Sequence, residues 1–296
     1  MSTNEHGTKK QTVMVATALT AILLWASAFP GTRFVLLHYS PGAVMVLRFV
    51  TASLTFIIIG LFKKIRLPKL KDLPLCIASG LSGVFLYSFL FTTGAVTVSA
   101  GVSSFIIASS PVFTMIFVRL ILKEKVKILS WVGIWVSFIG LAAVTLFQSE
   151  EFAFNFGVVL VLGAAICSGI YSLIIRQLTK TYTALEATTY TIIIGAIGTL
   201  FFLPDVIREL PTSTVDVNLV IVFLGVFPAG MAYLSWSYAM SKARDVSHVV
   251  VFTYLIPFIS SVLGYFWLGE TLTIFALIGG VVIIAGMVIT NYFGRE

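Results

Sequence analysis

The sequence predicts an all-α membrane protein whose ten transmembrane helices form two five-helix repeats of inverted topology. Three observations support this fold. Hydrophobic residues make up 58% of the chain and charged residues only 10%, whereas a soluble domain carries about 25% charged residues. Apolar stretches long enough to span a bilayer recur along the whole chain. The second half also repeats marked residues of the first half at a constant spacing.

The apolar stretches define the expected spans, since a transmembrane helix needs about 20 mostly apolar residues. Ten ranges qualify: 13–35, 41–62, 74–94, 100–122, 128–148, 156–177, 184–204, 218–239, 247–268 and 273–293. A turn at 39–42 separates the first two ranges, and a charged loop between Pro68 and Pro74 precedes the third. Pro204 and Pro211 bracket a polar stretch after the seventh. The connections are mostly short and leave no room for a soluble domain.

The internal repeat is clearest around two prolines, Pro111 and Pro257, which lie 146 positions apart. The same step pairs Tyr87 with Tyr233, Glu124 with Glu270, Gly133 with Gly279 and Gly140 with Gly286. A repeat of half the chain length determines the architecture. We therefore assign residues 1–149 to the first repeat and 150–296 to the second.

Basic residues predict the orientation. With the N-terminus in the cytoplasm, sixteen Lys and Arg residues fall in cytoplasmic segments and only Arg208 falls outside, which is a strong positive-inside bias. Both termini are then cytoplasmic in a multi-pass protein of the plasma membrane. The net charge of +7 follows from this bias, so we expect no nucleic-acid partner. Because each repeat has an odd number of helices, the two halves are inverted relative to one another.

Inverted repeats are typical of secondary transporters, which bind their substrate near the bilayer midplane between the halves. We therefore expect a carrier whose partners are a small-molecule substrate and the lipid bilayer, with no cofactor and no metal. A channel-like facilitator is one alternative. An intramembrane enzyme is another, although the chain has three His and no His-Glu-x-x-His motif. The glycine pairs at 133/140 and 279/286 fit either a helix contact within one half or a homodimer seam.

Arg48 is the most informative charged residue. It lies about seven residues, or roughly 10 Å, inside the outer end of the second span. A charge at that depth is costly unless it faces a cavity or finds a partner. No acid lies near it in the sequence, so we expect its guanidinium to face the central cavity and bind a substrate carboxylate. Arg33, near the outer end of the first span, is expected to reach the membrane surface or bind backbone carbonyls.

Aromatic and polar residues in the middle of the first and third helices of each repeat are the other candidates for a substrate-binding wall. They are Trp25, Ser27, Tyr87, Tyr171, Tyr233 and Trp236. Pro111 and Pro257 lie in the fourth and ninth spans, where each proline removes a backbone donor and kinks the helix. Such a kink serves either gating or static packing.

Glu124 and Glu270 each follow the end of one helix and precede the start of the next. A carboxylate is stabilised there by the helix dipole, so we expect anchoring rather than proton coupling. No Asp or Glu lies deep within the ten predicted spans. Transport should therefore run down the solute gradient, or depend only weakly on protons.

The sequence resembles the EamA branch of the drug/metabolite transporter superfamily at five places: Trp25-Ala26-Ser27-Ala28-Phe29, Leu47-Arg48-Phe49, the proline of Ser110-Pro111, Glu124, and Leu268-Gly269-Glu270. Two copies of the EamA repeat would cover nearly the whole chain. The resemblance implies a ten-helix exporter of small metabolites, with amino acids or related solutes as the usual cargo. It does not specify the substrate. We expect outward transport by alternating access.

Overall fold

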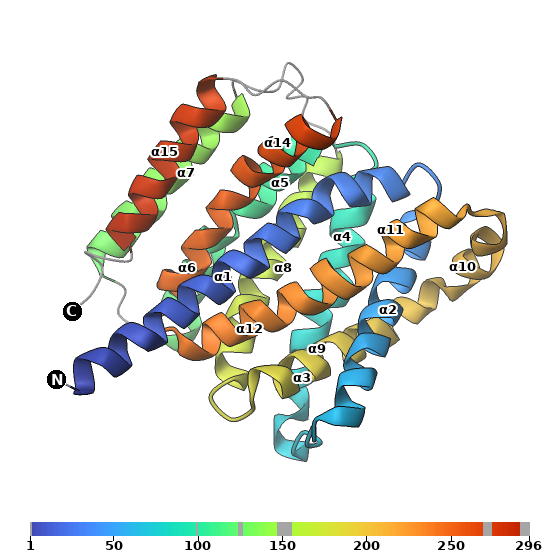
Figure 1. Ribbon diagram of the computed structural model, residues 1–296, viewed down its shortest axis with the longest axis horizontal. Helices are drawn as coiled ribbons and strands as arrows, with labels where there is room; N and C mark the ends of the chain where they lie inside the picture. The colour runs from blue at the N-terminus through green and yellow to red at the C-terminus, as the bar shows by residue number, and fades with distance from the viewer. Residues whose placement is uncertain (1, 99, 124–126, 147–155, 269–273, 291–296) are drawn as a thin grey trace.

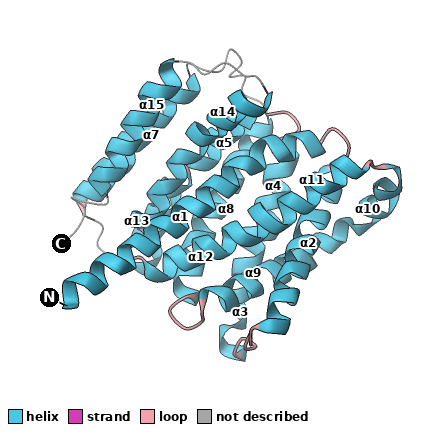
Figure 2. Cartoon of the chain, in the orientation of Figure 1, coloured by secondary structure: helices cyan, strands magenta, loops and turns pink. Residues whose placement is uncertain are grey.

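The computed structural model describes residues 2–98, 100–123, 127–146, 156–268 and 274–290 of the 296-residue chain. Helices and the loops between them account for these residues, and no strand occurs among them (Figure 2). The all-α prediction is therefore confirmed for the described part of the chain.

In the first half, α1 (Ser2–Val35) and α2 (Pro41–Phe62) are followed by three composite or single helices. The third helical run follows the short turn η1 (Leu70–Asp72) and joins α3 (Leu73–Gly80), the π-helical segment η2 (Leu81–Leu86) and α4 (Tyr87–Gly94). The fourth joins α5 (Ala100–Ala108), α6 (Ser110–Phe117) and η3 (Val118–Leu122), and the fifth is α7 (Ile128–Leu146).

The second half begins with α8 (Phe156–Leu178) and α9 (Ala184–Thr199), which is extended by η4 (Leu200–Phe202), α10 (Leu203–Glu209) and η5 (Leu210–Thr212). The next run joins α11 (Val215–Val226), the π-helical η6 (Phe227–Met231) and α12 (Ala232–Lys242). The last two runs are α13 (Ser247–Val250), η7 (Val251–Tyr254) and α14 (Leu255–Leu268), followed by α15 (Ile274–Val288).

Each of the ten predicted ranges contains helical structure. Seven of the described helical runs are long and apolar enough to cross a membrane, beginning with Lys10–Val35 and ending with Val215–Lys242. Two shorter apolar helices, Ile128–Gly140 and Ser247–Ser260, add to them.

Two stretches that the sequence marked as breaks between helices, 39–42 and 204–211, contain the starts of helices. Ser40 caps α2 by accepting a bond from the Ala43 amide at 3.3 Å, so Pro41 and Gly42 belong to the helix rather than to a turn. Proline suits the first helical turn because the amide it lacks would have no partner there. The stretch bracketed by Pro204 and Pro211 is likewise not a loop, because α10 begins with Pro204 in its first turn and carries an acid early and a base late.

Helices of the two halves pack against one another throughout the bundle (Figure 1). α1 of the first half packs along α12 and α14 of the second. α8 packs against α4 and α6, and α9 packs against α2 and α3. The core is therefore built between the halves rather than within each of them.

α7 and α15 form a pair at one edge of the bundle (Figure 1). A Cβ on Gly133 would lie 2.6 Å from the Gly286 carbonyl oxygen, and one on Gly140 would lie 2.8 Å from the Gly279 carbonyl oxygen. Ser137 Oγ also donates to the Ile283 carbonyl at 3.1 Å. The glycine pairs thus allow two helices from different halves to approach closely, so the expected helix contact within one half was wrong.

Candidate functional site

A cavity lies where helices of both halves meet. Its wall consists of Trp25, Ala28, Phe29, Arg48, Gly83, Tyr87, Phe91, Ile107, Ser110, Ser168, Tyr171, Tyr233, Thr253 and Ile256. The wall is largely aromatic and apolar, with a few hydroxyl groups and one charge.

Five side chains selected from the sequence come together on this wall: Trp25, Arg48, Tyr87, Tyr171 and Tyr233. They come from α1, α2, α4, α8 and α12. Helices far apart in the sequence therefore contribute single residues to one site, as expected for a cavity between two repeats.

Ser27 and Trp236 do not line the cavity. Ser27 Oγ donates to the Leu24 carbonyl at 2.7 Å, and its position two residues after Trp25 places it about 200° further round the helix. Trp236 is 1% exposed and lies against Trp25, with ring centroids 5.1 Å apart. It supports the cavity wall from behind.

Arg48 is buried, with 5% of its surface exposed. Its Nη1 donates to Thr32 Oγ1 at 3.4 Å, and its Nε has no hydrogen-bond partner. The guanidinium carbon lies 5.7 Å from the centre of the Phe49 ring. Among the described residues no carboxylate lies within 4.0 Å of it. The cavity wall thus carries a cation for which the described part of the chain supplies no counter-ion.

Unlike Arg48, Arg33 binds backbone carbonyls. Its Nη1 donates to the carbonyls of Ala95 at 2.8 Å and Val96 at 3.4 Å, just after the end of α4. Arg176 does the same in the second half, donating to the carbonyls of Met240 and Arg244 at the end of α12. The expectation that Arg33 binds backbone carbonyls is confirmed, and both arginines satisfy helix ends.

Two aromatic donors cross from one half to a π-helical segment of the other. Tyr233 OH donates to the Gly83 carbonyl in η2 at 2.5 Å. Trp25 Nε1 donates to the Pro228 carbonyl in η6 at 3.1 Å. The two rings also meet edge to face, with centroids 5.6 Å apart. These contacts fix the aromatic wall of the cavity.

Both proline positions adjoin the cavity. α5 ends at Ala108 and α6 begins at Ser110, with Pro111 in its first turn. In the second half, η7 interrupts the run just before α14, which contains Pro257. Ile107 and Thr253, each four residues before a proline, line the cavity, although the prolines themselves do not.

Several residues of the cavity wall were not predicted from the sequence. Their helical spacing from the predicted residues could have indicated them. Ala28 lies three residues after Trp25, and Phe91 lies four residues after Tyr87. Residues three or four apart share a helix face, so a search at these spacings would have included both. Gly83 belongs to η2, and no pattern we used predicts a π-helical segment.

No Asp, Glu or His is among the described residues that line the cavity. In the described part of the chain, no group of three or more His, Cys, Asp or Glu side chains is arranged to hold a metal ion. Glu124 and Glu270 lie outside the described residues.

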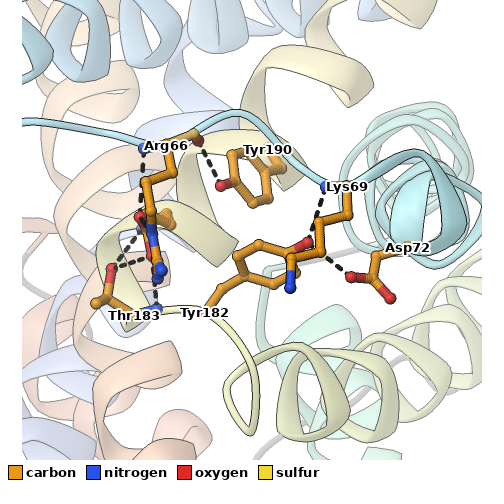
Figure 3. A network of polar contacts seen from close by, with 7 residues as sticks. Arg66, Lys69, Asp72, Tyr182, Thr183 and Tyr190 are labelled. Atoms are coloured by element: carbon orange, nitrogen blue, oxygen red, sulfur yellow. Dashed lines mark hydrogen bonds and ion pairs between the residues drawn. The ribbon is translucent and has the colours of Figure 1, made fainter.

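A second polar cluster joins the loop before α3 to the start of α9 (Figure 3). Arg66 donates from Nε to Glu186 Oε1 at 2.7 Å and from Nη2 to Oε2 at 2.9 Å. Glu186 also accepts from the Thr183 amide at 2.9 Å, and the Thr183 hydroxyl accepts from the Glu186 amide, which completes a capping box on α9. The bond to Glu186 raises the pKa of Arg66 above its usual value.

Two tyrosines extend this cluster (Figure 3). Tyr190 OH donates to the Arg66 carbonyl at 2.6 Å. Tyr182 OH donates to Asp72 Oδ2 at 2.7 Å and accepts from the Lys69 amide at 2.9 Å. We call this network of Arg66, Lys69, Asp72, Tyr182, Thr183, Glu186 and Tyr190 the loop clamp. The clamp fixes the first half to the second at one end of the bundle.

Known proteins resemble this chain over almost its full length. An uncharacterized transporter of Archaeoglobus fulgidus is 33% identical over 278 residues, covering 93% of this chain and 97% of its own. The uncharacterized transporter YdfC of Bacillus subtilis is 31% identical, covering 95% and 92%. A protein of Streptantibioticus cattleyicolor, described as a probable terminal-alkyne amino-acid exporter, is 31% identical, covering 91% and 90%.

The fold also matches a solved crystal structure, with a TM-score of 0.77 over 96% of this chain and 98% of that one, at 19% identity. The model of the EamA-like transporter family matches residues 12–146 and again residues 155–292. Together with the long apolar helices, these matches show a multi-pass membrane protein. The chain belongs to the EamA-like transporter family.

Proposed function

We propose that this protein is a secondary transporter that exports small carboxylate-bearing metabolites, amino acids and their relatives, by alternating access. The single observation that carries the proposal is Arg48, a buried guanidinium on the wall of the cavity that pairs with no carboxylate among the described residues. The amino-acid class is supported by the relative from Streptantibioticus cattleyicolor, which is described as a probable terminal-alkyne amino-acid exporter.

The charge of Arg48 explains the preference for a carboxylate. A buried cation is costly unless it is paired, and its Nε is unsatisfied. A carboxylate can accept two parallel bonds from a guanidinium fork, and such charge-assisted bonds are stronger than neutral ones. Substrate binding would therefore supply the counter-ion that the fold lacks.

The aromatic wall suits the rest of such a solute. Trp25, Tyr171 and Tyr233 form one continuous group. The ring centroids of Trp25 and Tyr233 lie 5.6 Å apart, and those of Tyr171 and Tyr233 lie 5.4 Å apart. Ring faces attract both an apolar side chain and an ammonium group. Because no carboxylate is among the described residues of the cavity wall, these residues offer ring faces and backbone or hydroxyl oxygens to the amino group.

We place ten spans in the plasma membrane, as inverted repeats of residues 1–149 and 150–296 with both termini in the cytoplasm. The two successive family matches support the division. The parallel roles of Arg33 and Arg176 at helix ends support the symmetry. One chain supplies the whole described cavity wall, so the proposal does not need the homodimer considered from the sequence.

Energy coupling follows from the same wall. Among the described residues no Asp, Glu or His faces the cavity, so this part of the chain offers no carboxylate or imidazole to carry a proton at the binding position. We propose transport down the solute gradient, or with only weak proton dependence.

Counterflow in proteoliposomes tests the proposal. Vesicles preloaded with unlabelled amino acids, the matching amides or simple amines are assayed for uptake of a labelled amino acid, with and without a pH gradient. Carboxylate-bearing solutes should stimulate uptake in a saturable way, and the amides and amines should not. Uptake that rises linearly without counterflow would favour the channel-like alternative. Chemical conversion of the solute would favour the intramembrane enzyme.

A further inference from the structure

The pair Tyr87 and Tyr233 has a role that the binding proposal does not include. We propose that the two tyrosines are positioning residues for the transport cycle, each latching one of the two states of the carrier. Tyr233 OH latches the present state through the Gly83 carbonyl, and Tyr87 OH latches the opposite state through the Ala229 carbonyl. This inference rests on the alternating-access function proposed above.

The first observation is the bond itself. Tyr233 is 5% exposed, and its hydroxyl crosses from α12 to η2 to donate to the Gly83 carbonyl at 2.5 Å. A π-helical turn departs from the usual bonding pattern of a helix, and such turns are frequent at functional sites. The Tyr171 ring occupies the place that a Cβ on Gly83 would take. The second half therefore contacts the first at this point through a hydrogen bond and through side-chain packing.

The second observation is the repeat. A step of 146 residues carries Tyr87 onto Tyr233 and Gly83 onto Ala229. The same step carries the start of η2 at Leu81 onto the start of η6 at Phe227. Donor, acceptor position and π-helical segment are therefore all duplicated.

The third observation is asymmetry. Only one of the two equivalent bonds is present, since the Tyr87 hydroxyl has no protein partner among the described residues, whereas Tyr233 has Gly83. Side chains of the first half do reach η6, because Trp25 Nε1 donates to the Pro228 carbonyl at 3.1 Å. A latch from Tyr87 to the next carbonyl, Ala229, is thus close to an existing contact.

Inverted repeats explain why the missing bond should belong to the other state. If the two halves exchange conformations, the carrier opens to the opposite side, and each contact is replaced by its counterpart. One buried hydrogen bond is then broken and an equivalent one formed. The exchange keeps the two states close in free energy, as a carrier needs in order to cycle. Because both tyrosines line the cavity with Arg48, a bound solute lies beside the latch.

The test measures which side of the membrane the cavity faces. Ser110→Cys places a reporter on the cavity wall, in a chain whose own Cys76 and Cys167 are replaced by Ser. An impermeant thiol reagent is applied to right-side-out and to inside-out vesicles, and the ratio of the two labelling rates is recorded. Tyr233→Phe and Tyr87→Phe each remove one hydroxyl but keep the ring.

We expect the two variants to change this ratio in opposite directions, each by about 5-fold or more, as for the loss of one buried hydrogen bond of about 1 kcal/mol or more. The double variant should return towards the parent ratio. Tyr238→Phe, on the same helix but 40% exposed and off the cavity wall, is the control and should change nothing. Thermal unfolding of each purified variant shows whether the fold is retained.

Shifts in the same direction, or unchanged ratios in folded variants, would overturn the latch while leaving the transporter intact. If the parent reporter is labelled from one side only, with or without amino acid, alternating access fails and the latch fails with it. The two failures are therefore distinguishable.

Discussion

Arg48 and Arg66 carry the same guanidinium group in opposite surroundings. Arg48 is 5% exposed and makes one long bond, at 3.4 Å, to the Thr32 hydroxyl. The Arg66 side chain is 60% exposed, yet it makes two short bonds to one carboxylate, that of Glu186. The exposed arginine has a counter-ion, whereas the buried arginine has none among the described residues.

This difference separates a structural charge from one available to a ligand. A carboxylate paired in the loop clamp fixes two halves together and offers nothing further to a solute. An unpaired cation in an apolar cavity lowers stability unless an anion pairs with it. The fold retains Arg48 in that costly position, and a substrate carboxylate is the partner that fits its chemistry.

The largest expected effect concerns the side of the membrane on which the loop clamp lies. Lys64 and Lys180 are exposed beside the clamp, and Thr212 is exposed at the opposite loops. In intact cells an impermeant thiol reagent should label Thr212→Cys and leave Lys64→Cys and Lys180→Cys unlabelled, in an all-or-none pattern. Labelling of Lys64→Cys would refute the proposed inverted topology.

The next largest effect is expected at Arg48. Arg48→Ala removes a charge-assisted contact of about 1.5–3 kcal/mol, so transport of carboxylate solutes should fall about 10- to 100-fold. Arg48→Lys keeps the charge but loses the planar fork, so its transport of carboxylate solutes should lie between that of the parent and that of Arg48→Ala. Uptake in proteoliposomes is measured against the amount of protein in the membrane.

Because Arg48 makes only one long bond within the protein, abundance of both variants should stay near normal, and cargo without a carboxylate should be little affected. If abundance falls as far as transport, or every cargo slows equally, Arg48 is a structural clamp between helices instead.

A smaller effect is expected in the loop clamp. Thr183→Ala removes the N-cap of α9, which stabilises a helix by about 1 kcal/mol, and should lower the melting temperature of the purified protein by a few degrees. Glu186→Gln also loses the pairing with Arg66 and should lower it further. Neither variant should change the KM for a carboxylate solute. A raised KM with an unchanged melting temperature would show that the clamp acts on binding.

The smallest effect is expected from pH. The bond to Glu186 raises the pKa of Arg66 above its usual value. A raised pKa gives stability that is fully present below the unfolded value and is lost only as pH rises through the folded value. The pairing therefore contributes equally across the physiological range. Since no acid or His is among the described residues of the cavity wall, transport should vary little between about pH 6 and 8. Steep accumulation driven by a proton gradient would contradict the proposed coupling.

The sequence predicted those features that depend on local pattern. The length of the apolar stretches located the helical ranges. The position of Arg48 well inside its span predicted that it is buried. The position of Arg33 near a helix end predicted that it binds backbone carbonyls. Tyr87 and Tyr233 were selected because each lies in the middle of the third helix of its repeat.

Features that depend on contacts between distant segments were missed. The partners Arg66 and Glu186 are 120 residues apart, and no short-range pattern connects them. Ser27 was assigned to the cavity because it adjoins Trp25 in sequence, although the helix turns it away to bond Leu24. The glycines of α7 meet α15 only because the halves associate. Hydrophobic periodicity gives no indication of a π-helical turn, so η2 and η6 were absent from the prediction.

The most direct test of the account is whether Arg48 distinguishes a carboxylate from a carboxamide. Binding of a transported amino acid and of its amide is measured on the purified protein, for the parent and for Arg48→Gln. We predict that the parent binds the acid about 10-fold or more tighter than the amide, and that Arg48→Gln binds the two about equally. Equal binding by the parent, or a preference that survives in Arg48→Gln, would contradict the assignment of Arg48 as the carboxylate site.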